Sequence, residues 1–422
     1  MTALSSKMKT FIYPNDTSYY GDYGTSDNRY YYTQNGILNI VEYPFPYDDD
    51  SPIRQIKIYT LDKNMKLKST KSINFSGIES YEFIWGGFYH AYDGSNYVVV
   101  GNNNHSLKKG VTVIKVIKYS KDWKKLKTLN IKSDVTYTYD GIYEPFAGGS
   151  LKMDASGNKL FIYTCRQTFP IYDRGIHQTN IAFEVNTDTM KLVKYPYNNY
   201  TSHSFNQFVK FKDNTLYLAD HGDGYPRGVK VVSAASYTGY SSYGKSFKKT
   251  PFAINGGYGE NYTGTTIGGM EIGQKNIITV GSSVPHNKTL KSIKGYKKSY
   301  NHNVYVIATD RETGKSTFKW LTKYNPKTSG YTVNDARLVK VTDNRFAVIY
   351  NVTTKKTGKK VLHCVYIDGS GNVIKNLTYK TIYFDCKSQP IMYNGYITFE
   401  GIYHSSTKKK DVTRIIRLPA QV

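Results

Sequence analysis

Apolar and polar residues alternate along most of this chain, in short runs separated by Asp, Asn and Gly. A period of two is the pattern of a half-buried β-strand, and Asp, Asn and Gly in the breaks predict tight turns. The segment 86–94 reads GGFYHAYDG, and the more apolar run YVVVG follows at 97–101. The predicted unit is therefore a hairpin: a small or polar start, an alternating strand, a tight turn and a more apolar strand.

This hairpin pattern recurs. Seven copies begin at residues 30, 86, 148, 204, 268, 336 and 390. A second hairpin follows the first, with strands typified by 111–119, 181–185, 304–309 and 363–367 and with turns rich in Asp, Asn and Gly. Two hairpins per unit make one four-stranded antiparallel blade, and a regular recurrence of such units indicates a propeller.

The sequence therefore predicts an all-β fold, a single seven-bladed β-propeller with four-stranded antiparallel blades. The predicted blades are 27–75, 79–132, 147–196, 201–254, 263–324, 331–380 and 388–418. The last copy supplies only three strands, so we expect an N-terminal strand at 8–13 to join it and close the ring. The Gly-Gly pairs are expected where inner strands approach closely near the axis. A pair of β-sandwiches or a β-helix remains the alternative.

Composition supports a β fold and leaves the charge open to two interpretations. The chain holds 42 Tyr, 18 Phe and 35 Gly, so helix should be scarce. The net charge of +25 favours attraction to polyanions. Alternatively, the lysines form a solvated surface and protect strand edges, because many cluster near strand ends.

Cysteine use and hydropathy limit the setting of the protein. Cys165, Cys364 and Cys386 are widely separated and suggest buried thiols rather than disulfides or a zinc site. No apolar run is long enough for a membrane span, and residues 1–9 lack the apolar centre of a signal peptide. We expect an extracellular or cell-surface protein whose signal is removed or absent from this sequence, with a cytoplasmic protein as the alternative.

The densest polar cluster falls in the fourth copy, before its first strand and after its second. We predict that His203 and His221 act there as acid or base, with Asp220 and Asp223 orienting them. The alternative is that both aspartates accept backbone hydrogen bonds in a Gly-rich loop. No residue is assigned to a metal and no cofactor is expected, although a calcium cation could bind among such oxygen donors.

Neighbouring polar residues complete the predicted face. The candidate ligand-binding residues are Ser150, Arg166, His177, Gln178, Ser204, Asn206, Gln207, Tyr225 and Arg227. The two arginines would suit a carboxylate or phosphate, because guanidinium is a bidentate donor. Loop tyrosines at 195–200 and 237–243 could stack on sugar rings or on another protein. Basic and aromatic residues occur without a recognised motif, so nucleic acid is not an expected partner.

Four segments, 143–151, 202–207, 220–227 and 263–271, carry a resemblance to a known family. They resemble an uncharacterised propeller-like domain of secreted or cell-surface proteins from clostridia and related Gram-positive bacteria. The firmest stretches are SHSFNQ at 202–207 and DHGDGYPR at 220–227. The resemblance covers about residues 80–380 and implies a location more than an activity.

These observations give three candidate functions. The leading one is a secreted or cell-surface binding protein that recognises a glycan or anionic cell-wall polymer at the propeller face. The second is a hydrolase or lyase acting on polysaccharide or peptide through the His, Asp and Arg cluster, which is expected in the central channel of the propeller. The third is a structural subunit of a surface assembly, formed by self-association, in which tyrosine surfaces form the subunit contacts.

Overall fold

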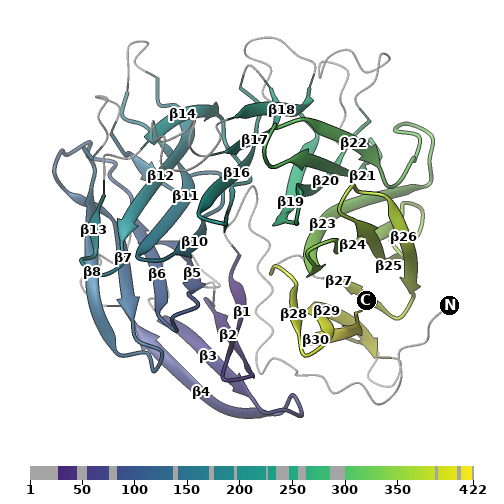
Figure 1. The fold of residues 1–422 in the computed structure, drawn as a ribbon, viewed down its shortest axis with the longest axis horizontal. Helices are drawn as coiled ribbons and strands as arrows, with labels where there is room; N and C mark the ends of the chain where they lie inside the picture. Colours follow the sequence, from purple (N-terminus) through teal and green to yellow (C-terminus); the bar gives the residue numbers. More distant parts are fainter. Residues whose placement is uncertain are drawn as a thin grey trace.

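The computed structural model describes residues 27–44, 55–75, 83–135, 141–170, 175–193, 197–224, 227–233, 247–254, 263–285, 300–384, 388–405 and 410–420. Within these ranges every regular element is a β-strand. The strands form seven antiparallel sheets arranged in a ring, which confirms the predicted seven-bladed propeller (Figure 1).

The first four blades run in order along the chain. Their strands are β1 (Arg29–Gln34), β2 (Ile37–Glu42), β3 (Gln55–Leu61) and β4 (Leu67–Asn74); β5 (Phe83–His90), β6 (Asn96–Asn102), β7 (Thr112–Tyr119) and β8 (Lys125–Lys132); β9 (Glu144–Pro145), β10 (Lys152–Ser156), β11 (Lys159–Gln167), β12 (Gln178–Asn186), β13 (Lys191–Leu192) and β14 (Tyr197–Ser202); β15 (Phe208–Lys212), β16 (Thr215–Gly222), β17 (Gly228–Ser233) and β18 (Lys248–Ala253).

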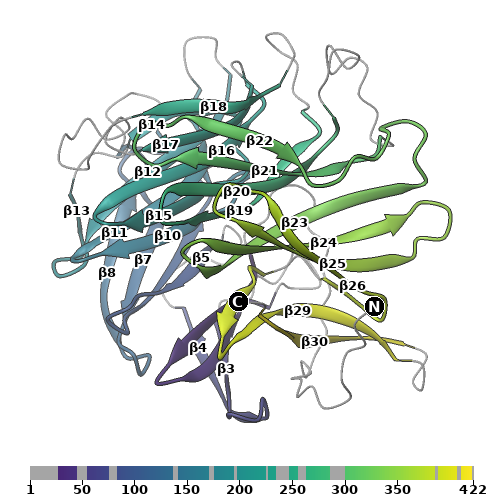
Figure 2. The same cartoon turned by 45° about the vertical axis from the view of Figure 1, so that its right-hand side comes forward.

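The last three blades complete the ring. Their strands are β19 (Thr265–Ile272), β20 (Asn276–Ser283), β21 (Asn303–Asp310) and β22 (Ser316–Trp320); β23 (Tyr331–Thr342), β24 (Arg345–Thr354), β25 (Lys360–Asp368) and β26 (Val373–Tyr379); β27 (Ile382–Phe384), β28 (Ile391–Tyr393), β29 (Tyr396–Ser405) and β30 (Lys410–Pro419). The two views show the blades following one another around the molecule (Figures 1 and 2).

Blade three differs from the predicted four-stranded pattern. Its outer strand β13 has only two residues, so part of the edge of β12 is left for β14 to pair with. The short strand β9 pairs with the same edge of β11 as β10 does, opposite Arg166 and Gln167. The sequence prediction assigns 197–200 to neither blade and 201–202 to blade four, whereas the structure places 197–202 in the sheet of blade three.

The hydrophobic core is divided among the junctions between blades. Seven buried clusters occur in the described residues, one at each junction. One of them joins Leu38 and Ile40 of blade one to Tyr393 and Ile415 of blade seven. Hydrophobic packing therefore joins the first blade to the last and helps to close the ring.

A buried ion cluster also closes the ring between blade one and blade seven. Arg29 Nε donates to Glu42 Oε1 at 2.8 Å, and Arg29 Nη1 pairs with Glu400 on β29. Tyr59 OH donates to the second oxygen of Glu42 at 2.8 Å. The guanidinium thus links the first and last blades across 371 positions of sequence.

The predicted closing strand lies outside the described residues. In blade seven, β27 and β28 both pair with one edge of β29, and β30 pairs with the other. The strands β28, β29 and β30 match the three that the sequence predicts, whereas β27 lies before the predicted start of this blade at residue 388. The pairing of 8–13 with this blade stays a prediction.

Glycines allow the inner strands to approach closely. A Cβ atom at Gly268 on β19 would lie 1.6 Å from the Ala336 carbonyl oxygen on β23. A Cβ atom at Gly269 would lie 2.5 Å from Leu338 Cβ. Any larger side chain would push these blades apart, which confirms the expected role of this Gly-Gly pair.

Lysines from one blade cap turns of the next. Lys71 donates to the Asp122 carbonyl at 2.8 Å, Lys118 to the Thr187 carbonyl at 2.9 Å, and Lys319 to the Ser370 carbonyl at 3.0 Å. Each acceptor lies in the tight turn before the outer strand of the following blade. Part of the lysine excess therefore has a structural use between blades.

Candidate functional site

The first element of the predicted site is a histidine–aspartate pair. His203 Nδ1 lies 2.7 Å from Asp223 Oδ1, and the His203 side chain is 32% exposed. The hydrogen bond to Asp223 raises the pKa of His203 above its ordinary value. Because Nδ1 is held by the carboxylate, Nε2 is the ring atom available to exchange a proton. His203 also has a φ of +50°, an uncommon conformation for a non-glycine residue.

The second element is a buried network at the junction of blades three and four. Gln207 Oε1 accepts from Ser150 N at 2.7 Å, and Gln207 Nε2 donates to Ser204 Oγ at 2.5 Å. Ser204 Oγ donates in turn to Asp220 Oδ2 at 2.5 Å. Gln178 joins the network through both its amide atoms, which bond the backbone of Ser204. The structure therefore brings five predicted residues together, but as a connected interior network rather than an open surface.

Asp220 is the charged centre of this network. Tyr163 OH donates to its Oδ2 at 2.7 Å and His221 N to its Oδ1 at 2.7 Å. Burial nevertheless raises the pKa of Asp220 to about 6, because removal from water disfavours the carboxylate more than these donors stabilise it. Burial lowers the pKa of Lys230, opposite Asp220 on β17, to about 8.

The other predicted residues are dispersed around this network. Arg166 and Arg227 are buried, at 0% and 2% exposure, so neither guanidinium is open to an anion in this conformation. His221 is also buried, and its Nε2 lies 2.7 Å from Thr263 Oγ1. The catalytic and binding roles assigned to these residues stay predictions.

Three further predicted positions have simpler surroundings. Asn206 Oδ1 accepts from Ile267 N at 3.1 Å and so links blade four to blade five. His177 is partly exposed, and its backbone N–H donates to Thr168 Oγ1 at 3.2 Å. Tyr225 lies outside the described residues, as do the tyrosines at 237–243. The side chains of Tyr197 and Tyr200 are likewise outside the description.

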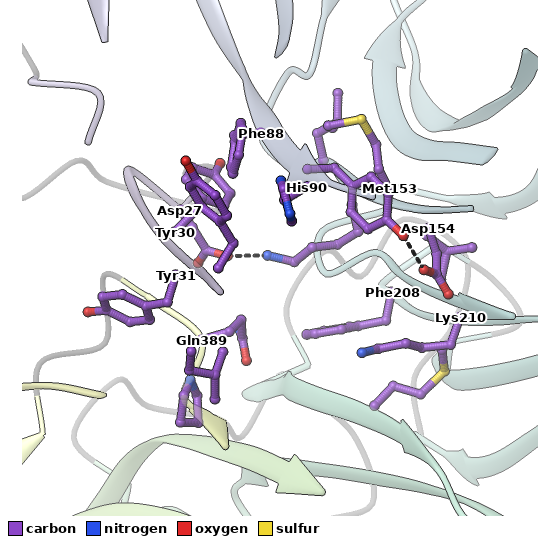
Figure 3. Close-up of a pocket in the computed structure, with 18 of the residues that line it drawn as sticks. Asp27, Tyr30, Tyr31, Phe88, His90, Met153, Asp154, Phe208, Lys210 and Gln389 are labelled. Carbon is purple, nitrogen blue, oxygen red and sulfur yellow. Dashed lines mark hydrogen bonds and ion pairs between the residues drawn. The ribbon is translucent and has the colours of Figure 1, made fainter. Parts of the chain in front are cut away.

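An axial cavity of about 280 Å³ lies next to the network (Figure 3). One strand of every blade, the one nearest the axis, contributes to its wall, through residues of β1, β5, β10, β15, β19, β23 and β28. Ser150 and Gln207 immediately precede Leu151 and Phe208, which line the cavity. The buried network therefore fixes the beginnings of two strands that form the cavity wall.

Opposite charges are paired along the cavity wall. Lys152 pairs with Asp27 at one side, and Lys210 Nζ lies 3.2 Å from Glu271 Oε1 at another. Figure 3 shows Asp27 on one side of the opening and Lys210 on the other. The carboxylate of Glu271 raises the pKa of Lys210, so this ammonium stays charged at neutral pH.

Asp154 lies between these two pairs in the wall. Its Oδ1 accepts from Tyr89 OH at 2.8 Å and its Oδ2 from Phe211 N at 2.6 Å. Asp154 is also among the charges that act on Lys210. Lys152 and Asp154 flank the buried Met153 on β10, so both charged side chains share the partly exposed side of this strand.

Aromatic rings form the apolar part of the wall. Tyr30 packs edge-on to Phe88 with ring centroids 5.7 Å apart, and Tyr32 lies over His90 at 4.3 Å. Lys152 Nζ lies 5.6 Å from the centre of the Phe208 ring. Burial lowers the pKa of His90, so its ring is uncharged at neutral pH. The cavity thus combines flat apolar faces with donors and acceptors of both charges.

The sequence contains a signal for this cavity that the predicted site does not use. Charged residues flank an apolar one in Lys152-Met153-Asp154, and Lys210 follows two apolar residues in Phe208-Val209-Lys210. These charged residues fall on the strands nearest the axis, and all three line the cavity. The predicted site instead follows the loops, and so stops a few residues before the cavity wall.

Metal and membrane features are not found in the part of the chain that the structure describes. No group of three His, Cys, Asp or Glu side chains is placed to hold a metal ion there. Binding of a calcium cation therefore stays a prediction without structural support. In the same residues, no helix has the length and hydropathy to cross a membrane. Cys165 and Cys364 are buried free thiols, as expected.

Comparison with known proteins finds similarity only at the level of structure. No family model matches the chain, and no curated protein does. An ulvan lyase from a new family of polysaccharide lyases aligns over 97% of this chain and 94% of its own, with 11% identity and a TM-score of 0.51. The Trypanosoma rangeli sialidase aligns over 95% and 72%, with 8% identity and a TM-score of 0.46. An exo-β-1,3-galactanase from Clostridium thermocellum aligns over 98% and 97%, with 11% identity and a TM-score of 0.36. At such identities the likeness to the ulvan lyase establishes a shared fold alone.

Proposed function

We propose that this propeller is a carbohydrate-binding protein and that one sugar residue occupies the axial cavity. The observation that carries the proposal is the combination of aromatic faces and paired charges in a single cavity. Sugar hydroxyls both donate and accept hydrogen bonds, so they suit a wall that offers carboxylates and ammonium groups together. Aromatic rings such as Phe208 and Tyr30 suit the apolar face of a sugar ring.

The size of the cavity favours one sugar residue over a longer segment. Its volume of about 280 Å³ lies just below the range for small-molecule sites, which begins at ~300 Å³. A polymer would therefore place one residue in the cavity and the remainder along the propeller face. There, the net charge of +25 would attract an anionic chain in a salt-dependent manner.

The ulvan lyase, a polysaccharide lyase by its name, shares this fold over nearly its full length. The shared scaffold is compatible with a carbohydrate ligand, and an extracellular or cell-surface setting accords with it. Because one fold hosts many functions, the proposal rests on the cavity and not on the neighbours.

Replacing Lys210 by Ala tests the proposal. We expect at least a tenfold loss of glycan affinity in calorimetric titration, because Glu271 loses its cationic partner and the sugar loses a donor. Lys212→Ala is the matched control: it lies on the same strand, pairs weakly with Asp343 at 3.9 Å and is absent from the cavity wall. Equal affinities for the two variants would exclude the cavity as the binding site.

The His203–Asp223 pair favours a second candidate function, a hydrolase or lyase with His203 as the proton-transferring residue. A carboxylate that fixes one ring nitrogen prepares the other for acid–base chemistry. In this case Asp223 is a positioning residue, since it acts through the histidine.

The pH profile of turnover tests this second function. His203→Gln should abolish release of reducing ends or unsaturated products from a bound polysaccharide. Asp223→Asn should move the His203-dependent limb of the profile to lower pH, because the bond to Asp223 raises the histidine pKa. If the wild-type protein binds the polysaccharide but does not cleave it, the second function is rejected and carbohydrate binding is retained.

A further inference from the structure

We propose that the sugar residue held in the axial cavity is uncharged, although the protein as a whole is strongly basic. This inference rests on the proposed function and specifies the ligand class of the same cavity. This differs from the expected anionic partner: the net charge of +25 favours polyanions at the surface, whereas the charges of the cavity wall do not select an acidic sugar.

The charges of the cavity wall cancel. The lining residues include three carboxylates and three cations, namely Asp27, Asp154 and Glu271 against Arg29, Lys152 and Lys210. Their formal sum is zero at neutral pH, and the lowered pKa of His90 adds no charge. A chain of net charge +25 thus surrounds a cavity wall without an excess of positive charge.

The cations are already occupied by carboxylates. Lys152 pairs with Asp27, and Lys210 pairs with Glu271. Arg29 is fully buried between Glu42 and Glu400, which lie beyond the lining residues. Each of the three cations of the wall thus already has a carboxylate partner.

An acidic sugar would therefore bind at a cost. To reach Lys210 or Lys152, its carboxylate would displace a carboxylate of the protein or lie beside one, and like charges at short range repel. A hydroxymethyl group at the same position can donate to Glu271 and accept from Lys210 without separating the pair. The wall thus discriminates by the pairing of its charges rather than by shape.

Matched sugar pairs test the inference by calorimetric titration. Methyl glucoside is compared with methyl glucuronide, and methyl galactoside with methyl galacturonide, because each pair differs at C6 alone. We expect the uncharged member of the bound pair to bind at least tenfold more tightly, with little dependence on salt. An acidic member that binds equally or more tightly overturns the inference while leaving carbohydrate binding in place. Absence of binding by all four sugars overturns both the inference and the proposed function.

A charge variant provides an independent readout of the same cavity. Glu271→Gln frees Lys210 from its carboxylate and should shift the preference toward the acidic sugar by about tenfold. Glu312→Gln, at an exposed turn residue outside the cavity, is the control and should leave the preference unchanged. A preference that Glu271→Gln leaves intact would contradict the proposed origin of the discrimination.

Discussion

Replacing Arg29 by Met is expected to lower the free energy of unfolding by about 3–5 kcal/mol, the usual cost of removing one partner from a buried ion pair. Arg29 has a side-chain exposure of 0% and is the shared partner of Glu42 and Glu400. Without the guanidinium, two carboxylates remain close together in the interior. Urea denaturation of the variant and the wild-type protein, side by side, measures the loss.

The pH dependence of this loss identifies its cause. In the variant, the two glutamates that have lost the guanidinium should have folded-state pKa values above those of the unfolded chain. The two carboxyl groups then destabilise the fold more as pH rises. The difference in unfolding free energy between variant and wild-type protein should therefore be smaller near about pH 5 than near about pH 8. Lys275→Met, which removes an 80% exposed lysine 4.0 Å from Asp310, is the control and should change stability by at most ~0.5 kcal/mol. A comparable effect of both substitutions would show that the buried cluster does not hold the ring together.

Replacing Asp220 by Asn should change how stability depends on pH. The folded pKa of Asp220, about 6, lies above the unfolded value of about 3.9. Its contribution to stability is therefore complete below about pH 4 and is lost as pH rises through about 6. The shift of roughly two pKa units corresponds to about 3 kcal/mol, a loss that the uncharged amide of the variant would not undergo. Between about pH 4 and about pH 7 the difference in unfolding free energy should thus move by roughly that amount in favour of the variant.

Asp310→Asn provides a control of opposite sign. Hydrogen bonds from the Thr313 backbone lower the pKa of Asp310, so its contribution is present at neutral pH and is lost as pH falls. The two variants should therefore diverge from the wild-type protein in opposite directions along the pH axis. Parallel profiles for the wild-type protein and the Asp220 variant would contradict the assigned ionisation of this network.

The fold follows from local signals because each hairpin is encoded within a few residues. Asn35-Gly36 and Asp213-Asn214 have positive φ at both positions, as two-residue hairpin turns of type I′ require. Alternation then fixes which residues face the neighbouring blade. The exceptions, such as the attachment of β14 to blade three, arise where the outer strand β13 is too short to use the whole edge.

The site was only partly predictable because its interactions differ in sequence separation. His203 and Asp223 are 20 residues apart and come from the start and end of one hairpin, so loop position was sufficient to associate them. Asp27 and Lys152 are 125 residues apart and meet only because the ring brings their blades together. Pairing across the axis is a property of the closed ring, which no local pattern specifies.

The most direct test of carbohydrate binding in the axial cavity is a crystal structure of the protein with the methyl glycoside that binds it. We predict one uncharged sugar residue in the axial cavity, in contact with Phe208 and within hydrogen-bond distance of the Lys210–Glu271 pair. A sugar bound only beside His203 or on the outer strands, with the axial cavity free of it, would contradict the central claim.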